Sequence, residues 1–369
     1  MTEALTAVGL MSGTSMDGVD VALIETDGVD ITAFGPTSSR PYLPAERQTI
    51  AAAVSEARGM THRTGRGGVI GEAERVVTEA HGEAVETFLR DNGIEAASVD
   101  VVGFHGQTIL HRPERQLTVQ LGDGQGLADR LGIDVVYDLR AADVAAGGQG
   151  APFVPVFHKA LAARTGLRTP IAILNLGGVG NVTWVGDGDP MAFDTGPGNA
   201  LLDDWVQKTA GRSFDEDGRL AAAGTVDNAI LARLMGNPYF DARPPKSLDR
   251  NDFDIALLEG LGVEDGAATL AAFTAASGAR SAEWFAEPVR QWIVVGGGAR
   301  NPTILAMLAA RVDAPVTTGT DIGWLGDHVE AQAFAYLAVR SLRGLPLSYP
   351  TTTGVPGPLT GGVLVRAAR

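Results

Sequence analysis

A stretch near the N-terminus decides the fold: Val8-Gly-Leu-Met-Ser-Gly-Thr-Ser-Met-Asp-Gly-Val-Asp-Val-Ala-Leu-Ile24. An apolar strand leads through a turn of small polar residues into a second apolar strand that alternates. The same pattern returns later as Ile171-Ala-Ile-Leu-Asn-Leu-Gly-Gly-Val-Gly-Asn-Val-Thr-Trp-Val185. Glycine lets backbone N–H groups crowd toward an anion, and hydroxyl or amide side chains complete such a cradle. Two such hairpins, one in each half, predict a duplicated clamp for the phosphates of a nucleotide.

The first turn differs from two common nucleotide-binding loops. A Walker A loop needs Gly-x4-Gly-Lys-Ser/Thr between a strand and a helix, whereas this turn has no lysine and leads into a strand. A Rossmann fingerprint opens a helix as well. The pattern therefore favours a phosphate-binding β-hairpin over either loop.

Composition bounds the class of protein. The chain has 369 residues, of which 45% are hydrophobic and 20% charged, which is typical of a globular protein with two domains. It has no cysteine, so disulfides, thiolate metal sites and cysteine nucleophiles are excluded. The N-terminus lacks the features of a signal peptide and no run of eighteen apolar residues occurs. We therefore expect a cytoplasmic protein without a membrane partner.

The net charge of −15 argues against nucleic acid as a partner, because phosphates need a basic face. A nucleotide is still compatible with this charge, since Mg²⁺ and oriented amides can supply local positive potential. No spacing of His, Asp and Glu indicates a dedicated metal site.

Periodicity predicts strands mixed with helices in two similar halves, which indicates an α/β architecture. In the first half we expect strands at 8–11, 19–25, 31–34, 99–104 and 133–137, and helices at 45–58, 71–92 and 152–164. The glycine-rich stretch 138–150 is the expected hinge. In the second half we expect the hairpin 171–185, strands at 191–193 and 292–295, and helices at 199–209, 266–285, 302–312 and 327–342.

The sharpest chemical motif is Phe193-Asp-Thr-Gly-Pro-Gly-Asn199. An aspartate ends a strand, and Asn199 can cap the helix that follows. Asp194 is a candidate general base, and a turn-forming aspartate that bonds its own backbone is the alternative. The motif also resembles the catalytic segment of pepsin-like proteases, but these need two matching Asp-Thr/Ser-Gly segments and this chain has one.

Other polar residues follow predicted strands. The turn Gly296-Gly-Gly-Ala-Arg-Asn301 precedes a helix and can accommodate a flat adenine and its ribose. His105 and Gln107 come just after a strand, where α/β sheets bind ligands, although a structural histidine is an equal alternative. The loop at Pro244-Pro-Lys-Ser247 reads as a surface turn that could also close over substrate, and Glu330 reads as a solvated side chain.

Taken together, these motifs resemble the anhydro-N-acetylmuramic acid kinase family of the actin/Hsp70/sugar-kinase superfamily. The resemblance spans nearly the whole chain, from Met11–Asp20 and Phe104–Thr108 through Gly147–Pro152, Leu174–Gly178, Phe193–Asn199, Pro245–Ser247 and Gly296–Asn301 to Glu330–Ala335. It implies two actin-like (ribonuclease H-like) domains with ATP and Mg²⁺ in an interdomain cleft, and a homodimer. Residues 1–140 with 340–369 would form the N-terminal domain and residues 141–339 the C-terminal one.

The resemblance also implies a reaction. Water opens the 1,6-anhydro bond while O6 takes the γ-phosphate of ATP, which gives N-acetylmuramate 6-phosphate and ADP in peptidoglycan recycling. Asp194 would activate the water and Glu330 would contact the sugar. We expect ATP contacts at Gly13, Thr14, Ser15, Met16, Asp17, Gly18, Val19, Asp20, Gly177, Gly178, Gly297, Gly298 and Asn301. We expect further sugar contacts at His105, Gln107 and Arg140; whether Asp17 or Asp20 orients Mg²⁺ stays open.

Two rival functions fit parts of the pattern. A kinase for another anhydrosugar, such as levoglucosan, shares the fold but acts on a sugar without lactyl and N-acetyl groups. A nucleotide-switched binding protein like the Hsp70 ATPase domain would hydrolyse ATP without sugar and would need an appended peptide-binding domain.

Overall fold

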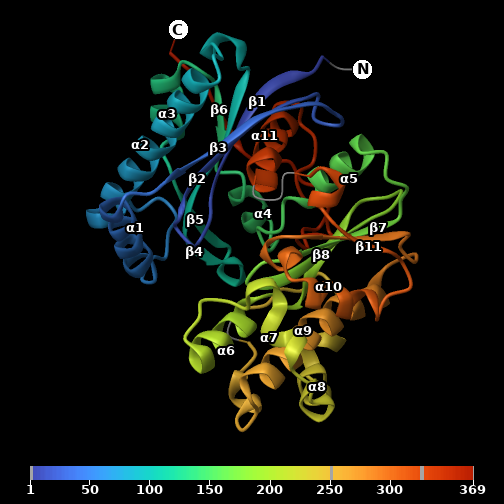
Figure 1. Cartoon of the computed structure of the whole chain (residues 1–369). Coiled ribbons are helices and arrows are strands. Elements are labelled where there is room, and N and C mark those ends of the chain that lie inside the picture. The colour runs from blue at the N-terminus through green and yellow to red at the C-terminus, as the bar shows by residue number, and fades with distance from the viewer. Residues whose placement is uncertain (1–2, 250–251, 325–327, 369) are drawn as a thin grey trace. The chain divides into compact units, whose positions relative to one another are not determined.

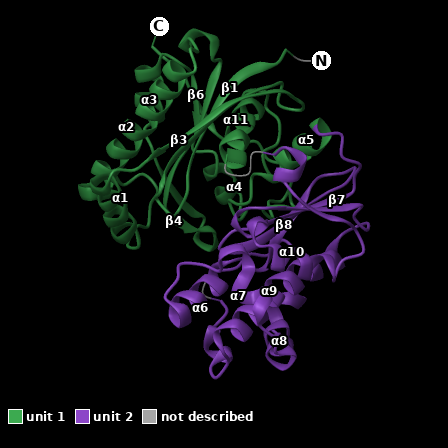
Figure 2. Ribbon diagram, in the orientation of Figure 1, with its two compact units in different colours: residues 1–164, 328–369 green, residues 165–327 purple. Residues whose placement is uncertain are grey.

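The computed structural model describes residues 3–249, 252–324 and 328–368. The chain forms two compact units, which Figure 2 colours separately: unit 1 comprises Met1–Arg164 and His328–Arg369, and unit 2 comprises Thr165–Asp327. This division differs from the expected boundaries at 140 and 340. The reason is packing, because helix α5 (Pro155–Arg164) contacts strand β3 of unit 1 and helix α11 (Val329–Leu342) packs on β1, β2 and β4 of the same unit.

The sheet of unit 1 begins with three antiparallel strands, as the first hairpin predicts: β1 (Leu5–Ser12), β2 (Gly18–Thr26) and β3 (Ile31–Pro41). Strand β4 (Val101–Arg112) pairs parallel to β1, and β6 (Val135–Tyr137) pairs parallel to β4. The order is β12-β6-β4-β1-β2-β3, with β12 (Val363–Val365) at one edge and β5 (Leu117–Leu121) paired to β4. Figure 1 shows strands β1 to β6 in blue to green.

Unit 2 repeats this order. Its strands β7 (Ile171–Leu176), β8 (Val179–Val185) and β9 (Met191–Pro197) are antiparallel, and β10 (Gln291–Val295) and β11 (Val316–Thr318) continue the sheet in parallel from β7. The order β11-β10-β7-β8-β9 matches β6-β4-β1-β2-β3 of unit 1, strand for strand. The α/β class and the duplication that the two hairpins predict are thus confirmed, in the arrangement expected of actin-like domains.

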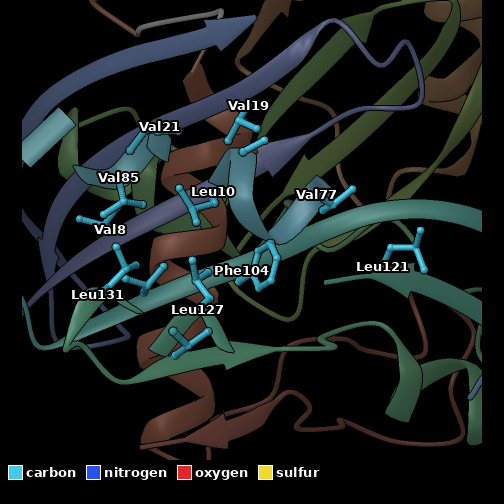
Figure 3. Close-up of a cluster of buried hydrophobic side chains, with 14 of the residues drawn as sticks. Val8, Leu10, Val19, Val21, Val77, Val85, Phe104, Leu121, Leu127 and Leu131 are labelled. Atoms are coloured by element: carbon cyan, nitrogen blue, oxygen red, sulfur yellow. The ribbon is translucent and has the colours of Figure 1, made fainter. Parts of the chain in front are cut away.

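Helices α1 (Pro44–Ala57), α2 (Gly68–Asp91) and α3 (Gly124–Leu131) contact the sheet of unit 1 and enclose its core. Figure 3 shows this cluster, in which Val8 and Leu10 of β1 and Phe104 of β4 gather with Val77 and Val85 of α2. Because successive strand residues point to opposite faces, the residues between these apolar ones point away from α2. The opposite face of the sheet is therefore available to pack against α11.

Helix α11 lies against β1 and β4 at a distance that only glycine allows. Gly9 and Gly103 are cross-strand neighbours in the parallel pair. A Cβ on Gly9 would overlap the carbonyl oxygen of Ala331, and one on Gly103 would overlap that of Phe334. Residues 331–340 of the helix are all buried, which explains why this stretch is apolar except for Gln332, Tyr336 and Arg340.

The helices of unit 2 are α6 (Ala200–Ala210), α7 (Arg219–Ala223), α8 (Asn228–Met235), α9 (Val263–Arg280) and α10 (Pro302–Ala309). Helix α9 packs on β8 and β9, and α6, α7, α8 and α10 all contact α9. In the described residues no helix is both long enough and apolar enough to span a membrane.

Several sequence expectations differ from the structure. Strands β3 and β9, expected to end at Phe34 and Phe193, continue to Pro41 and Pro197, so Asp194 lies within its strand. Strand β4 does not end at Phe104 but continues through His105, Gln107 and Thr108, with Gly106 at φ +69° bending it. The stretch 138–150 contains the short helix α4 (Ala141–Ala145), and β5 and α3 were not expected. The expected helix start at Asp327 lies outside the described residues; within them α11 begins at Val329.

The close packing of α11 gives a stability prediction. Gly103→Ala should lower the free energy of unfolding by about 1–3 kcal/mol, because the added methyl group overlaps backbone that cannot rotate away. Gly357→Ala is the matched control, since a Cβ there meets open space. Urea unfolding of both variants measures the difference, and equal midpoints for both would contradict this account of the contact.

Candidate functional site

The turn between β1 and β2 is accessible, as a ligand-binding turn must be. Thr14, Ser15 and Asp17 are exposed, and a Cβ on Gly13 would meet only the Ser15 hydroxyl at 3.7 Å. Packing therefore does not require glycine at position 13. The turn closes through a hydrogen bond from the Met16 N–H to the Gly13 carbonyl, 3.1 Å, with Met16 at φ +55°.

Its expected residues do not all offer side chains. The Val19 side chain lies in the core of unit 1, so only its backbone is available to a ligand. Gly18 is required by packing, because a Cβ there would overlap the carbonyl oxygen of Arg40 on β3. The exposed part of the turn is thus 13–17.

Buried polar side chains stabilise this turn by hydrogen bonds. Gln107 is fully buried; its Nε2 donates to the Gly13 carbonyl at 3.0 Å, and its Oε1 accepts from the Ser12 hydroxyl at 2.5 Å. Ser12 also lies 3.0 Å from the Tyr42 hydroxyl. Gln107 is therefore placed to fix the turn, and its amide is already engaged by the protein.

His105 is placed to orient Arg140. The Nε of Arg140 donates to Nε2 of His105 at 3.0 Å, which leaves Nδ1 of the ring to donate to the Gly106 carbonyl at 2.7 Å. Burial, and then the Arg140 charge, lower the pKa of His105 well below 6.5, so the ring is neutral. Arg140 also donates from Nη1 to the Gly150 carbonyl at 2.7 Å.

Acidic residues of unit 1 interact with this arginine. Glu330, in the first turn of α11, is exposed, yet desolvation by the protein atoms around it raises its pKa. The Arg140 charge opposes this rise in pKa and the Asp20 charge adds to it. Asp20 accepts from the Ser39 hydroxyl at 2.5 Å and lies 3.9 Å from Nδ1 of His328. Glu330 therefore interacts electrostatically with both Arg140 and Asp20, and Asp143 also acts on Arg140.

In unit 2 the turn between β7 and β8 is bonded to the start of α6. The Gly177 carbonyl accepts from the Asn199 N–H at 2.7 Å, and the Gly178 carbonyl accepts from Gly198 at 3.0 Å. The sequence predicts that the Asn199 side chain caps the helix, but it does not. Its Nδ2 donates instead to the Leu176 carbonyl at 3.0 Å. The carbonyls of this turn are thus used internally, unlike the exposed side chains of the first turn.

The third glycine turn borders a cavity of about 430 Å³ in unit 2. The cavity is lined by residues of three segments, including the expected Gly297 and Asn301: Asn199, Leu202, Asp203, Ser213, Phe214, Asp215, Glu216, Asp217, Gly297, Arg300 and Asn301. Gly296 adopts φ +80°, and Gly298 is buried against Leu176. Asn301 caps α10, since its Oδ1 accepts from the N–H groups of Thr303 and Ile304. This volume lies in the range of cavities that bind small molecules.

Asp194 lies in β9, with its side chain partly buried. Burial raises the pKa of its carboxyl from 3.8 to about 6, and a hydrogen bond from the Leu248 N–H to Oδ2, 2.8 Å, works against that rise. The Asp194 N–H donates to the Lys246 carbonyl at 3.0 Å, and its carbonyl accepts from the Tyr239 hydroxyl at 2.5 Å. A carboxylate with a pKa near neutrality suits a general base.

Two residues of this environment were not identified as functional from sequence. Tyr239 gave no signal, because its contact depends on how the chain returns to β9. Lys246 lies in the Pro244–Ser247 motif, which the sequence predicts to be a surface loop, without indicating a role for the lysine itself. In the described residues no group of three or more His, Asp or Glu is arranged to hold a metal ion.

The repeated sheet order and the glycine turns define a duplicated actin-like protein of the α/β class. The chain belongs to the anhydro-N-acetylmuramic acid kinase family, whose model matches residues 5–367. Relatives with that name include those of Nitrobacter winogradskyi, 56% identical over 98% of this chain and 100% of its own length, and Bradyrhizobium diazoefficiens, 56% identical over 98% and 99%.

Two solved structures resemble this chain at low sequence identity. Component A of the (R)-2-hydroxyglutaryl-CoA dehydratase of Acidaminococcus fermentans has a TM-score of 0.48 at 11% identity, covering 92% of this chain and 99% of its own. A ROK family glucokinase of Streptomyces griseus has a TM-score of 0.40 at 16% identity, covering 90% and 99%.

The raised pKa of Asp194 predicts a pH-dependent effect on stability. A carboxyl whose pKa rises on folding destabilises the protein once it ionises, by about 3 kcal/mol for a rise from 3.8 to about 6. Asp194→Asn removes this charge and should raise the free energy of unfolding by about 2–3 kcal/mol at pH 7.5. The gain should shrink as the pH falls from about 6 toward 4, because the folded wild type is then protonated.

Urea unfolding at pH 5, 6, 7 and 8 measures this gain. Asp187→Asn is the control, as Asp187 is an exposed aspartate of the same unit. A gain that is the same at every pH would show that the pKa of Asp194 is not raised.

Proposed function

We propose that the protein is an ATP-dependent kinase that opens the 1,6-anhydro bond of 1,6-anhydro-N-acetylmuramate and phosphorylates O6. The products would be N-acetylmuramate 6-phosphate and ADP, as peptidoglycan recycling requires. The observation that carries the proposal is Asp194, a carboxylate with a pKa of about 6 in a chain of this family. A cytoplasmic location and a homodimer belong to the same proposal and rest on the resemblance.

In this mechanism Asp194 takes a proton from the attacking water. Oδ2 accepts the Leu248 N–H, so Oδ1 is the oxygen assigned to the water. The water oxygen bonds to C1 as the bond from C1 to O6 breaks, and the electron pair of that bond stays on O6. O6 then attacks the γ-phosphorus, the bond to the β-phosphate oxygen breaks, and ADP leaves. The proton on Asp194 returns to solvent, which completes the balance.

For ATP, the exposed part of the first turn is the proposed phosphate contact. Its open glycine and its Thr14 and Ser15 hydroxyls suit a phosphate, and Asp17 or Asp20 would hold Mg²⁺, which offsets the charge of the triphosphate. The cavity beside Gly297 and Asn301 is proposed for the adenosine, because about 430 Å³ is ample for a nucleoside. The Gly177 and Gly178 turn would contribute backbone N–H groups.

For the sugar, Arg140 and Glu330 are the proposed contacts. The described residues provide no hydrogen-bond partner for Nη2 of Arg140, while His105 and Gly150 fix the rest of the guanidinium. A fixed guanidinium with a free N–H suits the lactyl carboxylate, which levoglucosan lacks. Glu330 would accept from a sugar hydroxyl. His105 and Gln107 would not contact the sugar directly. His105 would orient Arg140, and Gln107 would fix the turn at Gly13.

The direct test is phosphate transfer followed by mass spectrometry. Wild-type protein with MgATP should convert anhydro-N-acetylmuramate to a product heavier by one water and one phosphoryl group. Asp194→Asn should retain ATP binding and lose at least ~10²-fold in turnover, because the base is removed. Asp187→Asn serves as the matched control, since Asp187 is an exposed aspartate of unit 2 outside the proposed site.

Three results would overturn the proposal. Turnover of levoglucosan alone would identify the related kinase, and ATP hydrolysis without sugar would identify a nucleotide-switched binding protein. Full turnover by Asp194→Asn would remove Asp194 from the mechanism.

The pH profile supplies a separate prediction. Because the base must be ionised, kcat/KM for the sugar should fall about tenfold per pH unit below about pH 6 and level off above it. The measurement uses saturating MgATP, so that titration of the nucleotide does not contribute. A profile that is level from pH 5 to 8 is the outcome that this assignment does not allow.

A further inference from the structure

The ammonium of Lys246 is enclosed by aromatic rings and carbonyl oxygens. It lies 4.5 Å from the ring centre of Tyr239, 5.6 Å from that of Trp284 and 5.8 Å from that of Phe193. Its Nζ donates to the carbonyls of Tyr239 at 3.0 Å and Phe240 at 3.3 Å. A lysine on a loop is ordinarily solvated, so these contacts distinguish Lys246 from a surface residue.

The backbone of residues 246–248 is bonded twice to Asp194, once to its N–H and once to its carboxylate. The Lys246 carbonyl accepts the Asp194 N–H, and two residues later the Leu248 N–H donates to the carboxylate. Tyr239, whose ring and carbonyl contact the ammonium, donates its hydroxyl to the Asp194 carbonyl. The contacts form a closed circuit: Lys246 to Tyr239, Tyr239 to Asp194, and Asp194 back to residues 246–248.

We propose that Lys246 is a positioning residue, whose caged ammonium holds residues 246–248 so that the Leu248 N–H bonds the Asp194 carboxylate and directs its other oxygen to the reacting water. The inference rests on the proposed role of Asp194. Lys246 does not contact substrate in this scheme; it acts through the Leu248 amide and Tyr239.

A cation suits this place for a physical reason. Two carbonyl oxygens accept from one ammonium, and in this half-buried place they need a donor. The faces of the rings supply further negative potential, which an ammonium satisfies and a neutral side chain does not. Without the cation, the carbonyls of Tyr239 and Phe240 lose their donor, and the segment 246–248 loses its anchor.

Burial and neighbouring charges shift the pKa values of the groups in this circuit. Burial lowers the pKa of Lys246, with Arg280 adding to this and Asp241 and Glu283 opposing it. Burial raises the pKa of Tyr239, with smaller contributions from Asp194 and Asp252. Because the Leu248 N–H lowers the pKa of Asp194, loss of that bond should raise the pKa of the base.

The test compares Lys246→Met, Lys246→Arg and Tyr239→Phe with Lys208→Met, which alters an exposed lysine of α6. Lys246→Met should lower kcat by ~10–100-fold, as misplaced catalytic groups do, with the KM for ATP unchanged. The acid limb of the pH profile should move up from about pH 6 by roughly half to one unit. Lys246→Arg should restore most of kcat and return the acid limb of the pH profile to its wild-type position. Tyr239→Phe should resemble Lys246→Met, and the double variant should lose less than the product of the two losses.

Each outcome decides between the proposals. Wild-type kcat and an unmoved limb in Lys246→Met would overturn the inference, as would full multiplicativity in the double variant. If Lys246→Met does not fold, Tyr239→Phe carries the same test, and an unmoved limb there overturns it. Asp194→Asn is assayed alongside. If Asp194→Asn retains turnover, the proposed function fails. If Asp194→Asn loses turnover while Lys246→Met keeps wild-type kcat and pH profile, only the positioning role of Lys246 is overturned.

Discussion

Parallel pairing of one strand from each hairpin with a later strand is the constraint on which the rest of the molecule depends. In unit 1 this pair is β1 with β4, and in unit 2 it is β7 with β10. Parallel pairing sets the end of the first hairpin strand beside a fixed point of the later strand: Ser12 pairs with Gln107 within β4, and Asn175 pairs with Val295 at the end of β10. This pairing brings Gln107 under the Gly13 turn and Gly296 beside Leu176, although about a hundred residues separate the partners.

The two copies of this device have diverged in what they offer to a ligand. The turn of unit 1 presents hydroxyls and a carboxylate to solvent and is held by the buried amide of Gln107. The turn of unit 2 uses its carbonyls to hold residues 198–200, which carry the chain from β9 into α6. One copy is therefore built to present side chains, and the other to fix the strand that bears Asp194.

Much of this was predictable from the sequence, because it depends on local pattern. The hairpins, the repeated order and helices α1, α2 and α9 follow from alternation and from the 3.6-residue period. The end of β4 was misjudged because polar residues such as His105 and Gln107 usually mark a loop, whereas here they are buried and bonded within unit 1. Asn199 was expected to cap a helix, but the Leu176 carbonyl, distant in sequence, competes for its amide. The sequence places Lys246 in a loop and indicates no role for it, because the rings of Phe193 and Trp284 that contact it are distant along the chain.

Asp194 shows why such contacts cannot be read from a motif. Its pKa is a balance between burial, which raises it, and one backbone N–H, which lowers it. Burial favours the protonated carboxyl and the Leu248 N–H favours the ionised one, and together they give a pKa of about 6, which suits a general base. The motif Asp-Thr-Gly lies within β9, but the donor to its carboxylate comes from Leu248, whose position depends on the contacts of Lys246 and Tyr239. The strength of the base is therefore set by a segment some fifty residues away, which ties the chemistry of the site to the packing of unit 2.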